Sequence, residues 1–402
     1  MGLTLNDLKK VCELGHVCDY VNNRITSSMN YISTENMLPN KGGISESTII
    51  PPGTTTEYKI GDILISNIRP YFQKIWCADR CGGCSADVLC IRAKENTDSK
   101  YLYYLLSQQA FFDYVMSGAK GCKMPRGDKK QIMQWPVNIP AIDVQKKVVA
   151  ILSSLDNKIR LNRRINDNLE EQAKALFKSW FVDFEPFKGG KFVDSKLGPI
   201  PEGWSIGKVN DVVQILSGFA FKSETFVQSG PYRLITIKGV QDGYLDISGA
   251  SYISKVPLKM PAYCNLEIGD ILLSLTGNVG RVCIVDRPNL LLNQRVAKLQ
   301  PRRDKQDLLF VYILFRQDTF KNHLLQIARG TAQLNLSPVE TREISIILPP
   351  ANVLLEFSKI GQYLFDKIAL SNQETLRLSA LRDTLLPKLM SGELSVEEVS
   401  FD

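Results

Sequence analysis

Four cysteines stand within fourteen positions of one segment, WCADRCGGCSADVLC at residues 76–90. Thiolates at this density could bind Zn²⁺ or form a redox pair. The spacing C-x3-C-x2-C-x5-C of Cys77, Cys81, Cys84 and Cys90 does not give the two C-x2-4-C knuckles of most structural zinc sites. A redox C-x2-C pair is expected at a helix start in a thioredoxin-like setting, which the Gly-Gly centre does not favour. The spacing alone therefore settles neither chemistry.

The sequence lacks the common catalytic motifs. His16 and His323 are the only histidines, and neither lies in a pattern typical of a metal or nucleophile site. There is no GxxxxGK phosphate loop, no GxGxxG segment after a strand, no HExxH pair and no Asn-Pro-Pro-aromatic tetrapeptide of the DNA amino-methyltransferases. Glu57-Tyr58-Lys59 fits the end of a nuclease site, but no Pro-Asp pair precedes it. We therefore predict that this chain alone is not an enzyme.

The bulk composition is that of a globular protein with more than one domain. The chain has 402 residues, of which 44% are hydrophobic and 23% charged, and a net charge of +7. This length exceeds one ordinary core. Neither an apolar run of about 18 residues nor a secretory signal is present, so we expect a cytoplasmic protein whose nine cysteines are reduced. The positive charge suggests a polyanionic partner, although many proteins this basic have none.

The chain contains an internal repeat. IGDILIS at 60–66 returns as IGDILLS at 268–274, an offset of 208 positions. The order of three further pairs is the same: ADR at 78–80 with VDR at 285–287, VNIPAIDV at 137–144 with IILPPANV at 346–353, and DNKIRLN at 156–162 with FDKIALS at 365–371. These landmarks predict a duplicated unit of about 200 residues and two pseudo-symmetric domains.

Each repeat has a strand-rich front and a helical back. In the fronts, short β-rich runs between Gly, Pro, Asn and Asp clusters predict twisted, mainly antiparallel sheets, with a few helices such as 100–115 and 308–327. In the backs, apolar residues recur at intervals of three and four, from Val148 to Trp180 and from Phe357 to Leu385. This spacing predicts two long helices, each with a narrow apolar seam.

Prolines and polar residues punctuate the two predicted helices. Each helix follows a proline, Pro140 or Pro350, and Pro387 is expected to kink or end the second one. Asn162 and Ser371 interrupt the seams at equivalent places. They could fix the register of helix pairing, or mark a solvated bend.

We expect the two helices to pack antiparallel, because each would bury the other's seam. A helix over 142–181 would be about 60 Å long, and sheet domains near opposite ends of such a rod suit a bipartite ligand. The predicted parts are a first sheet domain at 1–141, a central helix at 142–184, a linker and second sheet domain at 185–349, and a C-terminal helix at 350–402.

The chain resembles the specificity subunits of type I restriction-modification systems over nearly its whole length. The resemblance rests on the duplicated layout and on four segments: SNIRPYFQKIW at 66–76, LFKSWFVDFEPF at 176–187, LGPIPEGW at 197–204 and LRDTLLPKLMSGELS at 381–395. It implies an α+β fold with two pseudo-symmetric target recognition domains, whose twisted, mainly antiparallel sheets are joined by two long helices in an antiparallel coiled coil. In this family each domain reads half of a split DNA target, and the coiled coil is the spacer.

The resemblance also implies the partners. Besides double-stranded DNA, these would be two methyltransferase subunits docked on the helices, and restriction subunits with translocase and nuclease activity. Methylation and cleavage would belong to those subunits. S-adenosylmethionine would bind the methyltransferase subunit, and this chain would bind no cofactor and no membrane.

Polar and basic residues on predicted loops are the candidates for DNA contacts, since Lys and Arg bind phosphates and Arg, Asn, Gln and Lys read base edges. In the first domain they are Asn67, Arg69, Lys74, Arg80, Lys120, Lys123, Arg126, Lys129 and Lys130. In the second they are Thr276, Asn278, Arg281, Asn293, Gln294, Arg295, Arg329, Thr331, Gln333 and Asn335. The basic loop at 118–130 is Lys-rich and its counterpart at 328–337 amide-rich, so we expect different half-sites and a non-palindromic target. A solvated basic loop is the alternative.

The predicted target has two short half-sites with an unspecified gap, facing major-groove segments about 34–36 Å apart. Apolar residues near the helix ends are candidates for partner docking: Phe177, Trp180, Phe181, Leu385, Leu386 and Leu389. For each, internal coiled-coil core is the alternative. Two other functions remain open, a stand-alone DNA-binding regulator that self-associates through its coiled coil, and an enzyme with an unfamiliar buried site.

The repeat sharpens the interpretation of the cysteine-rich segment. When ADR is aligned with VDR, Cys77, Cys81 and Cys84 face Ile284, Pro288 and Leu291, so the second copy has no thiols there. We therefore favour a strand, a turn at the two glycines and a return strand over a metal site.

Overall fold

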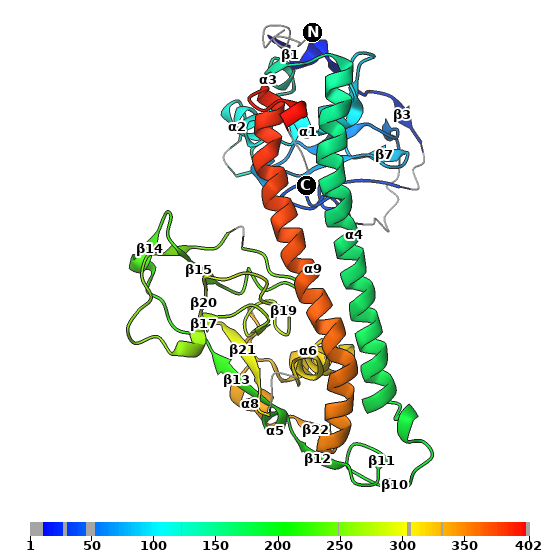
Figure 1. Cartoon of the computed structure of the whole chain (residues 1–402). Helices are drawn as coiled ribbons and strands as arrows, with labels where there is room; N and C mark the ends of the chain where they lie inside the picture. The colour runs from blue at the N-terminus through cyan, green and yellow to red at the C-terminus, as the bar shows by residue number, and fades with distance from the viewer. Residues whose placement is uncertain are drawn as a thin grey trace. The chain divides into compact units, whose positions relative to one another are not determined.

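The computed structural model describes residues 11–26, 30–45, 53–121, 123–247, 249–303, 307–330 and 333–398. The chain forms two compact units. Unit 1 comprises 1–158 and 378–402, and unit 2 comprises 159–377. Each of the two long helices, α4 (Ile142–Phe181) and α9 (Ala351–Ser391), contributes one part to each unit. Figure 1 shows the chain, with labels on many of its helices and strands.

The described residues of unit 1 form three small antiparallel sheets. Strands β1 (Val11–Glu13) and β9 (Pro136–Asn138) form the first, and β2 (Cys18–Tyr20), β8 (Val88–Ala93), β5 (Ile63–Ser66) and β6 (Ile75–Cys77) form the second in that order. The third has the order β3 (Arg24–Ile25), β4 (Thr55–Tyr58) and β7 (Gly82–Cys84). Helices α1 (Ser99–Leu106), α2 (Gln109–Ser117) and α3 (Lys129–Met133) complete the front.

Unit 2 repeats this arrangement. Strands β12 (Ser205–Lys208) and β22 (Ser345–Leu348) pair like β1 and β9, and the order β13 (Val213–Ser217), β21 (Val296–Pro301), β18 (Ile271–Ser274), β19 (Val282–Ile284) matches the four-stranded sheet of unit 1. Helix α5 (Val209–Val212) lies between β12 and β13, and α6 (Leu308–Arg316), α7 (Asp318–Ile327) and α8 (Pro338–Arg342) lie between β21 and β22. The matching strand order confirms the duplication inferred from the sequence.

Unit 2 also has a five-stranded sheet, which is larger than its counterpart in unit 1, the sheet of β3, β4 and β7. Its order is β14 (Phe226–Val227), β16 (Tyr252–Ile253), β15 (Tyr232–Ile235), β20 (Leu290–Leu292) and β17 (Asn265–Leu266). Its pairs are antiparallel except β15 with β20, which is parallel. A hairpin of β10 (Phe192–Val193) and β11 (Ile200–Pro201) lies in the segment after α4.

The helices pack antiparallel within each unit. In unit 1, Val148 and Leu152 near the start of α4 share a core with Leu386 and Leu389 near the end of α9. In unit 2, residues of the second half of α4, including Phe177, share a core with residues of the first part of α9, such as Phe357 and Phe365. The apolar seams are therefore buried, as their helical spacing predicts.

The polar interruptions of the seams pair with each other in unit 2. Asn162 and Ser371 are both buried, and the Ser371 hydroxyl donates to the Asn162 carbonyl at 3.4 Å. The Asn162 amide donates to Glu374 Oε2 at 2.7 Å. Since both helices are continuous here, the alternative of a solvated bend is wrong, and a role in register stays a prediction.

Two local predictions are wrong. The helices expected at 100–115 and 308–327 are each two helices, because Gln108 and Gln317 adopt extended conformations between them. At Pro387, where the helix was expected to kink or end, α9 does not end but continues to Ser391, and a kink stays a prediction. Burial of Leu386, Leu389 and Met390 in the unit 1 core offsets the cost of a proline inside a helix, about 3 kcal/mol.

The two glycines of the cysteine-rich segment lie in strand β7, not in a turn. Gly82 pairs with Tyr58, and a Cβ on it would lie 2.5 Å from the Tyr58 hydroxyl oxygen, so the glycine permits close packing. Gly82 pairs with Tyr58 as Leu290 pairs with Leu266, so Gly82 and Leu290 occupy equivalent positions in the two units. Cys84 therefore corresponds to Leu292, one residue away from the Leu291 that the sequence alignment gives. Burial of Cys77 raises the pKa of its thiol to about 11, which favours the unreactive form.

Candidate nucleic-acid interface

In unit 1, two of the predicted DNA loops lie side by side. The loop 67–69 follows β5, and a bridge between Ile68 and Arg126 joins it to the hairpin 120–126. The Arg69 amide donates to the Pro125 carbonyl at 2.8 Å, and the first and last residues of the hairpin exchange two backbone hydrogen bonds of 2.9 Å. Backbone bonds thus bring together residues that are more than 50 positions apart.

A third segment completes this arrangement. The amide of Asn67 donates to the carbonyl of Asp87 at 2.9 Å, in the turn that precedes β8. The loop 67–69, residue Asp87 and the hairpin 120–126 form the recognition frame of unit 1. Sequence reasoning did not single out Asp87, although it did single out Arg295, which occupies the same position in the repeat.

Unit 2 has the same frame, formed by the loop 275–277, Arg295 and the antiparallel residues 329–330 and 333–335, called the hairpin 329–335. The Leu275 amide donates to the Arg295 carbonyl at 3.1 Å, and the Gly277 amide to the Leu334 carbonyl at 2.9 Å. Thr276 bridges to Asn335, as Ile68 bridges to Arg126, and Asn335 bridges to Arg329. The two units therefore hold different side chains on equivalent backbone positions.

Charged and polar side chains cluster on the frame of unit 1. Arg126 NH2 lies 3.0 Å from Asp87 Oδ1, and Lys120 Nζ lies 3.0 Å from Asp128 Oδ2. The hydrogen bond from Lys120, with backbone bonds from the start of α3, holds the pKa of the Asp128 carboxyl below its usual range. Among the side-chain atoms that the structure describes, Arg69 Nε and Asn67 Oδ1 are buried without a hydrogen-bond partner.

Arg69 has a strained backbone. Its φ is +51°, a left-handed conformation, and the equivalent residue in unit 2 is Gly277, with a φ of +74°. The same holds for Gln73, with a φ of +51°, and Gly280, with a φ of +81°. Side chains at left-handed positions cost about 1–2 kcal/mol per residue. Unit 1 thus retains side chains where its repeat has glycine, which favours a functional role for them. Gln73 was not predicted from the sequence.

In unit 2 the frame carries amides and hydroxyls. The Thr276 hydroxyl donates to Asn335 Oδ1 at 2.8 Å, and Arg329 pairs with Glu340. Asn278, Gln294, Arg295, Gln333 and Asn335 are exposed. Asn293 is half-buried and accepts at its Oδ1 from the Gln294 amide at 2.7 Å, while Arg281 donates to Gln241. Thr331 lies outside the described residues.

The remaining candidates of unit 1 lie beside the frame or away from it. Lys74 accepts the Ser66 amide through its carbonyl, but its Nζ donates to the Thr34 carbonyl at 2.7 Å, and burial lowers the pKa of its ammonium group. Arg80 lies at the opposite end of β5, in the turn after β6, and pairs with Asp79 at 2.8 Å. Lys123 is exposed on the hairpin, and Lys129 and Lys130 are exposed at the start of α3. Arg80 is therefore not brought together with the other candidates.

Most of the residues predicted to dock partners belong to the interior of this chain. Phe177 and Phe181 are buried in the core of unit 2, and Leu386 and Leu389 in the core of unit 1. Trp180 and Leu385 are partly buried against the same cores. For these four buried side chains the alternative holds: they belong to the internal core, because little of their surface is left for a partner.

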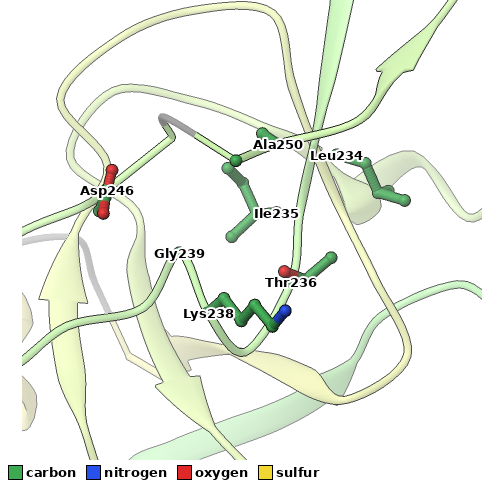
Figure 2. A pocket seen from close by; sticks show the side chains of 8 residues that line it. Leu234, Ile235, Thr236, Lys238, Gly239, Asp246 and Ala250 are labelled. Atoms are coloured by element: carbon green, nitrogen blue, oxygen red, sulfur yellow. The ribbon is translucent and has the colours of Figure 1, made fainter. Parts of the chain in front are cut away.

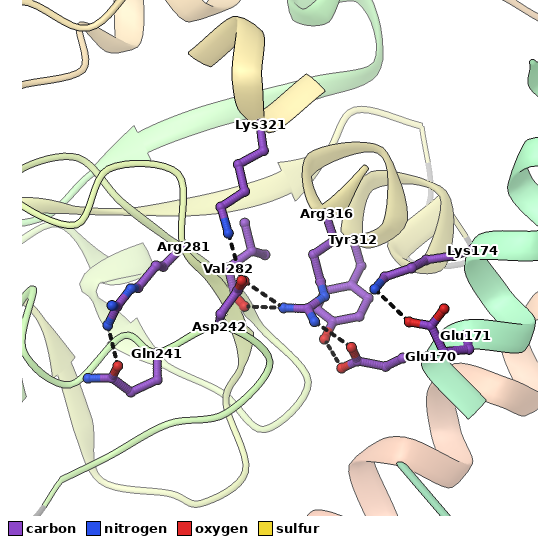
Figure 3. Close-up of polar contacts among 10 residues, drawn as sticks. All are labelled: Glu170, Glu171, Lys174, Gln241, Asp242, Arg281, Val282, Tyr312, Arg316 and Lys321. Atoms are coloured by element: carbon purple, nitrogen blue, oxygen red, sulfur yellow. Dashed lines mark hydrogen bonds and ion pairs between the residues drawn. The ribbon is translucent and has the colours of Figure 1, made fainter. Parts of the chain in front are cut away.

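An ion-pair network attaches helix α4 to the front of unit 2 (Figure 3). Arg316 of α6 lies 2.5 Å from Glu170 Oε2 on α4 and 2.9 Å from Asp242 Oδ1, and the Tyr312 hydroxyl donates to Glu170 Oε1 at 2.6 Å. Burial would raise the pKa of the Asp242 carboxyl, but the Lys321 hydrogen bond and the charge of Arg316 outweigh it and lower that pKa. The network connects α4 to α6 and, through Asp242, to Lys321 of α7.

A small cavity lies beside β15 (Figure 2), at the strand end that contacts Asn293. Its volume is about 190 Å³, and its lining includes Ile235, Thr236, Lys238 and Asp246. This volume is below the usual range of small-molecule sites, about 300–1,000 Å³. Among the described residues, no group of three or more His, Cys, Asp or Glu is placed to hold a metal ion. In the same part of the chain, no helix is long and apolar enough to cross a bilayer.

Comparisons with known proteins agree with this duplicated frame. The family described as "Type I restriction modification DNA specificity domain" matches residues 6–171 and 201–379. The chain is 29% identical to the type I restriction enzyme MjaIX specificity subunit of Methanocaldococcus jannaschii, over 76% of this chain and 71% of that protein. It is 26% identical to the HindI specificity subunit of Haemophilus influenzae, over 90% of this chain and 94% of that protein.

A solved structure has the same fold. The crystal structure of a type I restriction-modification S subunit from M. genitalium matches with a TM-score of 0.50 and 16% identity, over 96% of this chain and 98% of that one. Since the family matches also span most of the sequence, this chain belongs to the type I restriction-modification DNA specificity family.

Proposed function

We propose that this chain is the DNA-specificity subunit of a type I restriction-modification complex. It is a non-catalytic subunit that reads a bipartite, non-palindromic DNA target, with one half-site for each recognition domain. Methyltransferase and restriction subunits supply the chemistry, and S-adenosylmethionine binds the methyltransferase subunit. The complex acts in the cytoplasm, where DNA is its substrate.

One observation carries the proposal: the recognition frame occurs twice with different side chains. The frame of unit 1 presents Arg69 and Arg126, and the frame of unit 2 presents Arg295 and Asn335. Arg and Asn are the side chains that read guanine and adenine edges in the major groove. A regulator that self-associates would need no second, different frame on the same chain.

The test is to map methylated adenines in DNA from cells that carry this chain and its methyltransferase. We expect methylation at a split, non-palindromic sequence, and none when this chain is omitted. Binding of the purified complex to an oligonucleotide panel should show two short half-sites with a tolerated gap. A continuous six-base site, or methylation without this chain, would contradict the proposal.

We further propose that methyltransferase subunits dock on the exposed face of the helices, with one site on α9. Ile360, Tyr363 and Leu370 are exposed apolar residues of α9 in unit 2. Their spacing of three and seven places them on one face of the helix. An apolar face of this kind on a helix whose opposite side is already buried suits a partner subunit.

The docking test is the double variant Ile360→Ser and Tyr363→Ser. We expect the methyltransferase to stop co-purifying while the melting temperature of the chain changes little, because both side chains are exposed. Leu258→Ser is the matched control, since Leu258 is an exposed leucine of unit 2 outside the helices. Assembly that survives in the double variant would contradict docking on this face.

A further inference from the structure

At two positions of the recognition frame, the two units have side chains of different charge. The carbonyls of Asp87 and Arg295 accept equivalent hydrogen bonds, from Asn67 and Leu275, so these residues occupy the same backbone position. Arg126 and Asn335 correspond in the same way, through their bridges to the loop that follows β5 or β18. Because the repeat folds with an arginine in place of the aspartate, the frame itself does not require a carboxylate at residue 87.

A carboxylate on this surface needs a reason. Phosphate groups repel it, and the affinity of DNA-binding proteins comes mainly from basic residues. Asp87 accepts the Asn67 amide at its carbonyl, and its Oδ1 is 3.0 Å from Arg126 Nη2. The side chains of Asp87 and Arg126 are 36% and 57% exposed, so the pair is open to solvent and adds little stability.

We propose that Asp87 is a specificity-determining positioning residue, which holds the guanidinium of Arg126 so that its free donors face one guanine of the first half-site. This inference rests on the proposed function. A guanidinium has five N–H donors in a planar fork. One contact to Asp87 leaves enough donors for the bidentate contact with guanine O6 and N7. A fork held in one orientation before binding loses less conformational freedom on binding.

Unit 2 has a similar device built from other residues. There the hydroxyl of Thr276 donates to Asn335 Oδ1 at 2.8 Å and fixes the amide of the residue that corresponds to Arg126. Asn reads adenine most readily, as Arg reads guanine. The equivalent positions 126 and 335 therefore read different bases, each oriented by a neighbouring side chain.

The test uses the complex of the full chain with its methyltransferase and the mapped target. Competition binding is measured with oligonucleotides in which each base pair is changed singly. For the unchanged chain, we expect one G·C pair of the first half-site whose replacement weakens binding about 5- to 150-fold. In Asp87→Asn this loss should shrink by about 2- to 5-fold, the scale of an exposed ion pair, and at that base pair alone. Binding to non-specific DNA should stay equal or become tighter, because a negative charge near the phosphates is gone.

Two further variants define the contact. Arg126→Lys keeps the charge without the fork, so discrimination should fall at the same base pair. Asp79→Asn removes the carboxylate of a similar exposed ion pair, 2.8 Å from Arg80, at the opposite end of β5. That control should leave discrimination unchanged at every position.

The outcomes separate this inference from the function on which it rests. If the unchanged complex binds without sequence preference, the proposed function is overturned and this inference with it. If the unchanged complex has a preference and Asp87→Asn keeps it at all positions, or weakens binding to all sequences equally, the positioning role alone is overturned. Arg126→Lys acting at a different base pair would also overturn it.

Discussion

The network around Arg316 allows a quantitative test of how the front of unit 2 is attached to helix α4. The perturbation is a double-mutant cycle with Glu170→Leu, Arg316→Leu and the two changes combined. The side chains of Arg316 and Glu170 are only 9% and 12% exposed. Removing Glu170 leaves a buried guanidinium with one carboxylate fewer and the Tyr312 hydroxyl without its acceptor.

The burial sets the expected magnitude. Breaking a buried ion pair from one side costs about 3–5 kcal/mol, whereas replacing both partners by apolar residues is often nearly neutral. We therefore expect each single variant to lose about 3–5 kcal/mol and the double variant to lose less than the sum of the two. The comparison pair in unit 1 is Asp156, whose side chain is 29% exposed, and Arg382, whose side chain is 24% exposed. Asp156 also accepts a hydrogen bond from the Tyr104 hydroxyl at 2.7 Å. The greater exposure of this pair predicts a smaller interaction energy, about 1 kcal/mol.

Hydrogen exchange measured by mass spectrometry is the suitable assay, because it follows the two units separately. Amides of α6 should exchange about 100- to 4,000-fold faster in each single variant, which is the loss of 3–5 kcal/mol expressed as a rate. Amides of α1 in unit 1 are the internal reference and should not change. An interaction energy below about 0.5 kcal/mol, or equal energies for the two pairs, would refute the link between burial and anchoring.

Three further perturbations have definite expected outcomes. Gly127→Ala should cost about 1–3 kcal/mol and weaken DNA binding, because its Cβ would lie 2.8 Å from Val115 Cγ1. Gly189→Ala, whose Cβ meets nothing within 4 Å, is the control, and equal melting temperatures would contradict the reasoning. Phe177→Ala should lower stability by about 3–5 kcal/mol, seen in urea unfolding, and loss of methyltransferase binding at unchanged stability would contradict its role in the core. Acidification should weaken the network at Asp242: since the pKa of its carboxyl is lowered from the ordinary 3.8 in the folded chain, its contribution is complete above pH 3.8 and is lost as the pH falls through the lower pKa of the folded chain. Protection factors of α7 amides, corrected for the intrinsic pH dependence of exchange, that stay constant as the pH falls from 5 to well below 3.8 would contradict this.

The sequence by itself determined the duplication, the two long helices and their buried seams. These features depend on local patterns, since an apolar residue every three or four positions has one way to be buried, against another helix or sheet. The repeat carried information of a second kind. It showed that the thiols of the segment 76–90 have no counterparts, and that the loops at 118–130 and 328–337 differ.

Residues far apart in the sequence were placed only by the tertiary structure. Loop 67–69, Asp87 and hairpin 120–126 meet through backbone hydrogen bonds between separate segments, which no local pattern specifies. The same is true of Phe177, whose apolar character fits a docking surface and a core equally well until its neighbours are known. Arg80 illustrates the opposite case: it is close to Lys74 in the sequence but lies at the other end of β5, because consecutive strands run in opposite directions. Local spacing thus specifies the elements, whereas the pairing of distant backbone segments decides which side chains share a surface.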